Sequence, residues 1–331
     1  MYSSPLTFKV PLSIPLLKSS LTASCRYPAS IEEVMSCGVP WHMRFSIFFY
    51  FTASTVFFTQ RGRFLARTTG EERGNVLLRQ AQYRASDSPY ESVRLAKGFI
   101  LGKIYNARWV LERATRDHPM RVPVERLKGL SSQLAAALAN AESCETPGEL
   151  LGIEGEAAQA YFSGFDSLIL QQRDAFAFSG RSRRPPLDPI NALLSFAYSL
   201  LARDCAAALE GVGLDPYVGF LHRPRPGRAS LALDLMEELR CVYADRFVLS
   251  CVNQRILTGE HCHRQESGAV FLTDEGRRAF LSAWQKRRQE AITHPFLGEK
   301  LPDWKAAANL VRKIAENYKL PYYTLSPTYS V

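Results

Sequence analysis

The sequence has no CxxC pair, and its seven cysteines are an odd number spread from Cys25 to Cys262. A disulfide framework needs paired cysteines and an oxidising compartment. The cysteine pattern therefore predicts free thiols in a reducing cytoplasm.

Uncharged runs long enough to cross a membrane are also missing. The clearest candidate, residues 45–60, has 16 residues without a charge, whereas a membrane helix needs about 20. Its phenylalanines and β-branched residues favour buried strands instead. Pro5, Pro11 and Pro15 interrupt the start of the chain, which lacks the basic-then-apolar pattern of a signal peptide. We therefore expect no membrane span.

Acidic residues are fewer than basic ones, 32 Asp and Glu against 41 Lys and Arg, which gives a net charge of +9 and a pI near 9.2. Such a balance favours a polyanionic partner, because neutralised phosphates release counterions. The alternative is a basic soluble protein with no nucleic-acid partner. The length of 331 residues suggests two domains of about 100–200 residues each.

The pattern of the chain changes near residue 56. Residues 1–56 hold four Lys or Arg and two Glu, with no sustained hydrophobic period. From Val56 onward, the sequence predicts strands at 56–59 and 63–67 with a turn between them. We therefore predict an N-terminal β region over residues 1–71, in which residues 1–55 are atypical, and a second domain over residues 72–331.

Helix signals dominate the second domain. Ser88, Pro89 and Glu91 form a helix start with an N-cap, a proline in the first turn and an acidic third residue. This helix is expected to run to about residue 116. Further helices are expected at about 75–83, 123–142, 147–172, 188–211, 229–258 and 274–291. The predicted fold class is α+β, with a small and incomplete β region followed by a large all-helical catalytic domain.

Two candidate functional residues lie next to apolar segments. Glu154 lies in an apolar helical stretch between Gly152 and Gly155, which permit close approach. His222 follows the apolar run 217–221 and precedes a basic, proline-broken loop. The structural alternatives are an exposed helix residue for Glu154 and a hydrogen-bonded histidine with no chemical role for His222.

A third stretch carries two acidic residues beside a leucine stripe. Leu231, Leu235 and Leu239 recur every four residues and are expected to face the core. Asp234 and Glu237 are three residues apart and share the neighbouring face. Like charges placed this way repel each other unless a cation lies between them. The alternative is a solvated acidic face.

Together, these residues offer carboxylate oxygens and one imidazole. Such hard ligands suit Mg²⁺ or Mn²⁺ better than metals that bind thiolates. A cation held there could polarise a phosphodiester. A metal phosphohydrolase for small substrates stays open at this point, although the basic loops disfavour it.

The same stretches resemble a known family, the DNA-inserting CRISPR-associated endonuclease/integrase informally called "Cas one". The resemblance rests on Leu150–Gly155, Pro189–Leu201, Gly219–His222 and Leu231–Glu237, in this order. It covers about residues 56–298. Residues 61–79 are similar to the branch that accompanies type I-C systems.

The resemblance implies an N-terminal β domain and a helical C-terminal domain that carries a Mg²⁺ or Mn²⁺ site. It places the metal ligands at Glu154, His222 and Glu237, with Asp234 as a supporting acid. It also implies a homodimer that acts on double-stranded DNA and is bridged by a small ferredoxin-like partner, informally "Cas two". The implied reaction joins 3′-hydroxyl ends of short duplex DNA to the CRISPR array by transesterification, without a covalent enzyme intermediate.

Residues 1–55 depart from the family pattern, which ordinarily fills this stretch with alternating strands. A shifted reading frame, a wrongly chosen start or a divergent β domain would each explain the departure. A second hypothesis follows from it, namely a helical DNA-binding or complex-forming protein that has lost its activity through an aberrant N-terminus.

Two loops supply candidate phosphate contacts. They contain Arg181, Arg183 and Arg184, and Arg223 and Arg225. Asn191, Ser195 and Tyr198 share a helical face, which is either a polar-lined packing face or, as the family pattern implies, a face near the metal site that Asn191 supports. The sequence His261-Cys262-His263 looks superficially like a metal cluster but has no distant matching pair.

Overall fold

The computed structural model describes residues 46–50, 54–58, 64–68, 76–211, 213–289, 291–293 and 300–302. The chain divides into two compact units, residues 1–68 and 69–331. The sequence-based prediction placed this boundary between residues 71 and 72.

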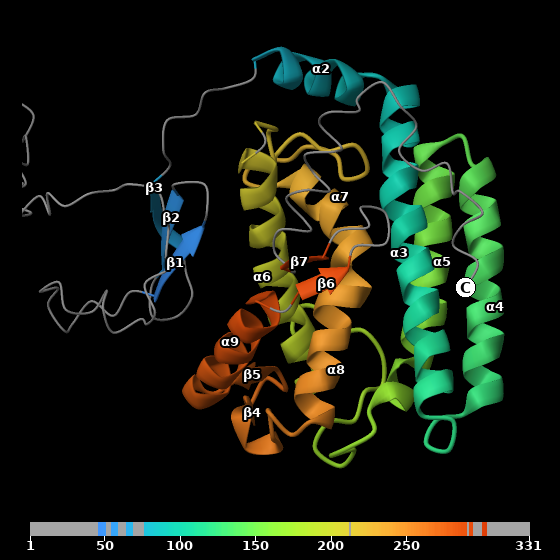
Figure 1. The fold of residues 1–331 in the computed structure, drawn as a ribbon, viewed down its shortest axis with the longest axis vertical. Coiled ribbons are helices and arrows are strands. Elements are labelled where there is room, and N and C mark those ends of the chain that lie inside the picture. The colour runs from blue at the N-terminus through green and yellow to red at the C-terminus, as the bar shows by residue number, and fades with distance from the viewer. Residues whose placement is uncertain are drawn as a thin grey trace, which may run out of the picture. The chain divides into compact units, whose positions relative to one another are not determined.

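The first unit contains a three-stranded antiparallel sheet in the order β1-β2-β3 (Figure 1). Its strands are β1 (Ser46–Tyr50), β2 (Ser54–Phe58) and β3 (Phe64–Thr68). The strands expected at 56–59 and 63–67 are present as β2 and β3. The strand β1 lies within the stretch expected to be atypical, and residues 1–45 lie outside the described residues.

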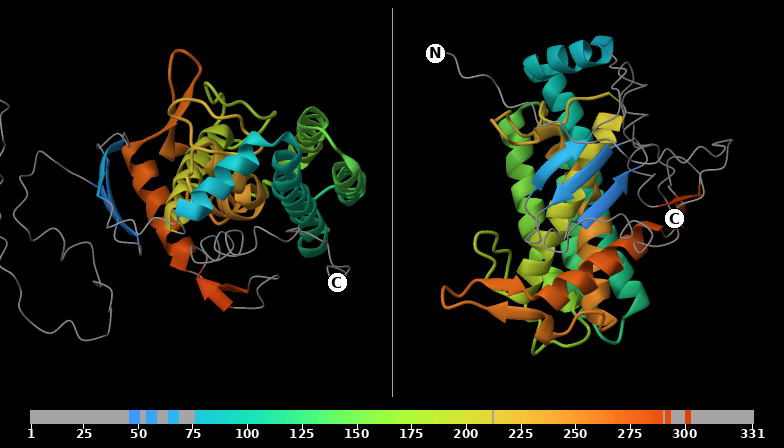
Figure 2. Two further views of the ribbon diagram at one scale, coloured as in Figure 1. Left: turned by 90° about the horizontal axis from the view of Figure 1, so that it is seen from above. Right: turned by 90° about the vertical axis from the view of Figure 1, so that its left-hand side faces the viewer.

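The second unit begins with α2 (Val76–Asp87) and continues through three long helices, α3 (Pro89–Asp117), α4 (Val124–Ser143) and α5 (Pro147–Phe165). These three pack side by side (Figures 1 and 2). The start of α3 has its expected cap, because Ser88 Oγ accepts a hydrogen bond from the Glu91 backbone N–H at 3.4 Å. Thr146 caps α5 in the same way.

The remaining helices are α6 (Pro189–Gly211), α7 (Ser230–Leu239), α8 (Arg246–Asn253) and α9 (Asp274–Gln289). Of these, α7 packs against α3, α6 packs against α7, and α8 packs against α6 and α9. A π-helical segment, η2 (Arg240–Asp245), connects α7 to α8. Two short 3₁₀ segments are η1 (Asp166–Leu168) and η3 (Gly259–His261). The strand β4 (Cys262–Arg264) pairs with β5 (Val270–Leu272). The strand β6 (Ala291–Thr293) pairs with β7 (Lys300–Pro302). The predicted α+β class is confirmed.

A close approach of α3 and α7 positions the site described below. A Cβ atom at Gly102 of α3 would lie 2.7 Å from Glu238 Cγ of α7. Any side chain at this position would force the Glu238 side chain to move, so glycine permits the close crossing. The two helices are also joined by Asn106, whose side-chain amide donates to the Glu238 carbonyl oxygen at 2.8 Å.

Two expectations about helix ends were wrong. The helix expected to reach residue 172 ends at Phe165, because the Asp166 carboxylate accepts the Phe178 N–H and pairs with Arg173, so the chain turns back. The helix expected over 229–258 is divided by η2 and ends at Asn253. The hairpin β4–β5 was not expected.

One helix among the described residues, α6, has the length and composition to cross a membrane, and 39% of its most apolar window is buried inside the protein. Core helices pass the same test. Ile190, Leu193, Leu194 and Ala197 of α6 are fully buried in the hydrophobic core.

Candidate active site

Two glutamates from different helices meet at one buried lysine. Lys103 of α3 is 6% exposed, and its ammonium forms an ion pair with Glu154 Oε1 of α5. The same Nζ atom lies 2.6 Å from Glu237 Oε2 of α7. Glu154 lies 51 positions after Lys103, and Glu237 lies 83 positions after Glu154. The fold brings these three residues to one point. The structure thus brings Glu154 and Glu237 together at the Lys103 ammonium, a cationic group that the sequence analysis did not name.

Glu237 is buried and has a second cationic partner. Its Oε1 atom lies 2.8 Å from Arg240 Nη2, one helical turn further along the chain. Burial by itself would raise the pKa of Glu237, but Arg240 and Lys103 outweigh it, so this pKa is lowered. The Oε2 atom is buried and contacts the Lys103 ammonium. Glu237 is therefore a charged carboxylate with a cationic partner on each oxygen.

Asp234 holds the loop that carries His222. This carboxylate is fully buried, and it accepts backbone N–H groups from Phe220, Leu221 and His222 at 2.6–3.0 Å. It also lies 2.6 Å from His222 Nδ1. A carboxylate hydrogen-bonded to one ring nitrogen of a histidine orients the ring, so that the other nitrogen can bind a metal or a substrate. The alternative of a solvated acidic face is therefore wrong for Asp234.

The close approach of this loop depends on Gly219. A Cβ atom there would lie 2.7 Å from Asp234 Oδ2 and 2.8 Å from the Ser230 backbone carbon. No side chain can be accommodated without moving the backbone, so this glycine allows the loop to reach the carboxylate.

The three predicted ligands differ in how closely they assemble. Glu154 and Glu237 share Lys103, and His222 is close enough to act electrostatically on Glu237. Across the described ranges, no group of three His, Cys, Asp or Glu residues is arranged as a ready metal cluster. The donor set, two carboxylates and an oriented imidazole, fits Mg²⁺ or Mn²⁺ chemically. The Lys103 ammonium stands between the two carboxylates.

A second cluster continues from Arg240 toward α6. The Arg240 guanidinium lies over the Tyr198 ring at 4.6 Å, and the Arg181 guanidinium lies 5.2 Å from the same ring. Tyr198 Oη donates to Asp245 Oδ1 at 2.6 Å. Burial raises the pKa of Asp245, which is fully enclosed. Tyr198 thus belongs to a contact chain that begins at Glu237 and passes through Arg240.

Asn191 organises the loop before α6. It is fully buried, and its amide donates to the Gly180 carbonyl oxygen at 2.7 Å while its Oδ1 atom accepts the Ser182 N–H at 3.0 Å. The same Oδ1 accepts Arg181 Nη1 at 2.5 Å. Asn191 therefore holds Arg181 against the Tyr198 ring.

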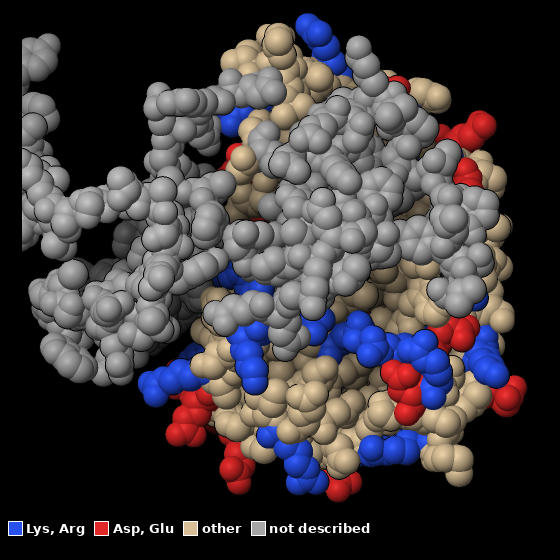
Figure 3. All heavy atoms as spheres, viewed as in Figure 1, with Lys and Arg blue, Asp and Glu red and all other residues tan. Residues whose placement is uncertain are grey.

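The candidate phosphate contacts fall into two groups. Arg181 is half-buried and engaged with Asn191, Ser195 and Tyr198, so it has few donors left for DNA. Arg183, Arg184, Arg223 and Arg225 are exposed. Basic side chains also form a band across the lower part of the face shown in Figure 3.

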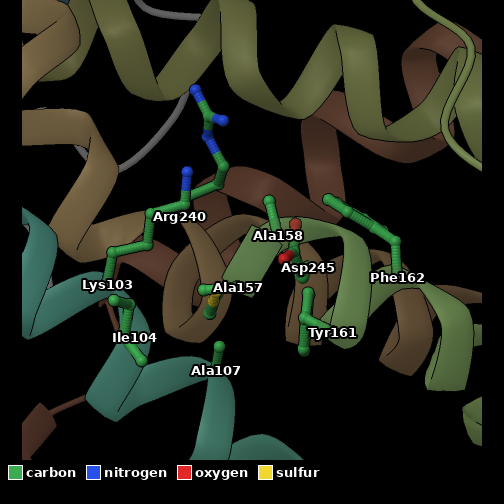
Figure 4. A pocket seen from close by; sticks show the side chains of 10 residues that line it. Lys103, Ile104, Ala107, Ala157, Ala158, Tyr161, Phe162, Arg240 and Asp245 are labelled. Carbon is green, nitrogen blue, oxygen red and sulfur yellow. The ribbon is translucent and has the colours of Figure 1, made fainter. Parts of the chain in front are cut away.

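A small pocket lies beside Lys103 (Figure 4). It is lined by residues of α3, α5 and η2, among them Lys103, Ala107, Ala157, Arg240 and Asp245. Its free volume is ≈ 10 Å³, about the space of one water molecule. Asp245 Oδ2 and Tyr161 Oη are buried without a hydrogen-bond partner.

The sequence His261-Cys262-His263 has a structural role. The His261 Nδ1 atom accepts the Thr258 backbone N–H at 2.9 Å and closes a capping box on η3. His263 packs on Phe271 across the β4–β5 hairpin.

Lys103, Arg240 and Asp245 were not predicted from the sequence. A signal for Lys103 existed, because it occupies the buried face of α3 with Ala96, Ile100 and Ala107 at helical spacing. A lysine in such a stripe needs a buried partner.

Comparison with known proteins places these residues in context. A family model described as "CRISPR associated protein Cas1" matches residues 51–286. "CRISPR-associated endonuclease Cas1 2" of Rhodospirillum rubrum is 54% identical over 245 residues, which cover 73% of this chain and 70% of the relative. "CRISPR-associated endonuclease Cas1 1" of Chlorobaculum tepidum is 44% identical over 287 residues, or 82% of this chain and 84% of the relative. Among solved structures, a casposase bound to its integration product is similar with a TM-score of 0.68 and 26% identity, over 80% of this chain and 71% of that one.

Proposed function

Because the chain belongs to the Cas1 family of CRISPR-associated proteins, we propose that it is a metal-dependent DNA endonuclease and integrase of CRISPR adaptation. It inserts short duplex DNA as new spacers into the CRISPR array. The relatives named as endonucleases and the similar casposase, which was solved with an integration product, support an enzyme of the nuclease and integrase class.

One observation carries this proposal, namely the meeting of Glu154, Glu237 and a buried ammonium at the junction of α3, α5 and α7. Bringing two carboxylates from separate helices together costs free energy, because like charges repel at this range. Such an arrangement is typical of a site built for cations.

We assign the following roles to the residues. Glu154 and Glu237 bind Mg²⁺ or Mn²⁺ through their carboxylate oxygens, and His222 supplies the ring nitrogen that does not face Asp234. A cation held by these residues would polarise the phosphodiester and would stabilise charge on the attacking and leaving oxygens. Asp234 fixes the tautomer and orientation of His222. Arg183, Arg184, Arg223 and Arg225 bind phosphates of the DNA backbone.

The proposed reaction is a transesterification. A 3′-hydroxyl oxygen of the incoming duplex attacks a phosphorus atom of the array, and the bond from that phosphorus to its former 3′-oxygen breaks. The attacking hydroxyl loses its proton, and the leaving oxygen gains one. One phosphodiester is exchanged for another, so the reaction needs no covalent enzyme intermediate.

The assembly follows from family membership. We propose that the protein works in the cytoplasm as a homodimer and binds the small ferredoxin-like partner known as Cas2. The assignment to the type I-C branch rests on residues 61–79 and is part of this proposal.

Single alanine substitutions at Glu154, His222 and Glu237 test the function. Each is expected to reduce DNA cleavage and strand joining to background, because each removes one proposed ligand. Binding of duplex DNA should persist, because the exposed arginines supply it. The measurement is strand transfer of labelled duplex DNA with Mn²⁺, beside a binding titration.

Glu156→Ala is the matched control, since Glu156 is exposed on the same helix as Glu154. It should cut and join DNA as the parent does. Full strand transfer by any of the three ligand variants would contradict the proposal. An inactive parent protein that still binds DNA would instead support the hypothesis of a binding protein without catalysis.

A further inference from the structure

A lysine lies at the place where the proposed function needs a divalent cation. The Lys103 side chain is 8% exposed, and its ammonium contacts one oxygen each of Glu154 and Glu237. Both of these carboxylates are proposed ligands. Lys is almost never fully buried unless it is paired, so its position here depends on the two glutamates.

The charges around this point balance without a metal ion. Glu154 and Glu237 supply two negative charges, and Lys103 and Arg240 supply two positive ones in direct contact. A divalent cation added beside all four groups would face the Lys103 ammonium across a poorly solvated space. The cation and the ammonium therefore compete for the same two carboxylate oxygens.

We propose that Lys103 is a positioning residue that holds Glu154 and Glu237 together before the metal binds, and that its ammonium leaves this place when the metal arrives. This inference rests on the proposed function, because it takes the two glutamates as metal ligands. The Lys103 ammonium would thus weaken metal binding, because it must be displaced, and it would stabilise the metal-free fold.

The pocket beside Lys103 offers a place for the displaced ammonium. Lys103 and Asp245 both line it, together with the small side chains of Ala107, Ala157 and Ala158 (Figure 4). Asp245 Oδ2 is buried and has no hydrogen-bond partner, so it can accept a donor that enters the pocket. The flexible four-carbon stem of lysine permits such a change of rotamer. Arg240 cannot take this role, because its guanidinium is held between Glu237 and the Tyr198 ring.

Lys103→Met tests the inference with Mn²⁺ alone, without DNA. Calorimetric titration should show Mn²⁺ binding at least about tenfold tighter than in the parent, a change of about 1.4 kcal/mol. In a chelator, the variant should unfold at a lower temperature than the parent, because the two carboxylates then repel. Adding Mn²⁺ should raise its unfolding temperature by more than it raises that of the parent.

Lys97→Met is the matched control, since Lys97 lies on the same helix and donates to the Glu142 carbonyl oxygen away from the site. It should leave Mn²⁺ affinity unchanged.

If Lys103→Met is too unstable to measure without metal, Lys103→Met combined with Glu154→Gln should recover stability in the chelator, because one of the repelling charges is gone. No recovery would overturn the inference.

Asp245→Asn separates displacement from the simple loss of a nearby charge. In the parent, it should weaken Mn²⁺ binding several-fold, because the ammonium loses its second partner. In a protein that already carries Lys103→Met, Asp245→Asn should no longer weaken Mn²⁺ binding through this loss. Equal effects in both backgrounds would overturn the displacement.

The outcomes also separate this inference from the proposed function. A parent that binds Mn²⁺, with a Lys103→Met variant of equal affinity and equal stability in chelator, overturns the inference alone. Failure of both parent and variant to bind Mn²⁺ overturns the metal site and the inference together.

Discussion

At the scale of single residues, the Asp234 carboxylate is the centre of four hydrogen-bond contacts at the site. It accepts three backbone N–H groups and faces His222 Nδ1. An asparagine has the same shape but turns one acceptor oxygen into a donor. It would therefore oppose N–H groups that are already buried.

We expect Asp234→Asn to lower the free energy of unfolding by about 1–3 kcal/mol, the cost of buried donors left without an acceptor. Strand transfer should fall, but less than in Glu154→Ala, because Asp234 orients a ligand and is not one. Urea unfolding and strand-transfer rates measure the two effects. Unchanged stability would show that the loop does not depend on this carboxylate.

Asp204 gives a prediction for pH. Burial raises its pKa from the ordinary value of 3.8 to about 6, although Arg288 opposes the shift. Between these two values, the folded protein keeps a proton that the unfolded chain releases. The resulting stabilisation is complete below about pH 4 and is lost as the pH rises through 6.

Asp204→Asn should remove this dependence, because asparagine has no proton to lose. We expect the stability of the variant relative to the parent to rise by about 1–2 kcal/mol between about pH 4 and pH 6.5. The side chain is 18% exposed, so the effect should be smaller than the full shift implies. Denaturation at several pH values measures it, and a constant difference would contradict the assignment.

Local signals were readable from the sequence, and long-range pairings were not. The Ser88 cap depends on a residue three positions away, so its pattern is visible in the chain. Lys103 depends on Glu154 and Glu237, which only the packing of three helices brings near. The chemical nature of the glutamates and His222 could be inferred from motifs. Their connection to Lys103 and Arg240 required the structure.

At the scale of elements, hydrophobic period predicted where helices begin better than where they end. The start of α6 at Pro189 and the start of α9 at Asp274 lie at or next to the expected residues. The end of α5 depends on the Asp166 contact with Phe178, twelve residues on, which no helical period contains. The β4–β5 hairpin escaped notice because each strand has three residues.

Gly102 allows a test of the α3–α7 crossing. Gly102→Ala should lower the free energy of unfolding by about 1–3 kcal/mol, because the added methyl would overlap Glu238. It should also disturb Glu237 and reduce strand transfer. Gly129→Ala is the control, since its helix site has nothing within 4 Å, and it should gain about 0.5–1 kcal/mol from helix propensity. Urea denaturation of both variants measures the two changes in the free energy of unfolding. Equal changes in Gly102→Ala and Gly129→Ala would argue against a close crossing.

At the scale of the whole molecule, positive charge is expected to dominate the binding of DNA. The net charge of +9 and the exposed arginines of the two loops predict an affinity that depends on salt. Contacts of this kind read phosphates and not bases, so the sequence preference of binding should be weak.

The double substitution of Arg223 and Arg225 by Gln should flatten the plot of log affinity against log salt by about one unit for each phosphate that is no longer neutralised. Arg264→Gln on the β4–β5 hairpin is the control, and it should keep the slope of the parent. Fluorescence titration of duplex DNA at several salt concentrations gives the slopes. A parent whose affinity is independent of salt would show that these loops do not face DNA.

The π-helical segment η2 (Arg240–Asp245) bears on how the gene can change length here. A π turn holds one residue more than an α turn, so the coding sequence carries what amounts to a one-codon insertion between α7 and α8. Loss of a single codon in this stretch would let the helix run on as a plain α-helix, and the residues after it would keep nearly their present facing relative to Glu237. Loss of a codon within α7 or α8 would instead rotate everything after it by about 100° and turn the hydrophobic face of α8 away from the core. Within this helical stretch, η2 should therefore be the place that tolerates the loss of one codon.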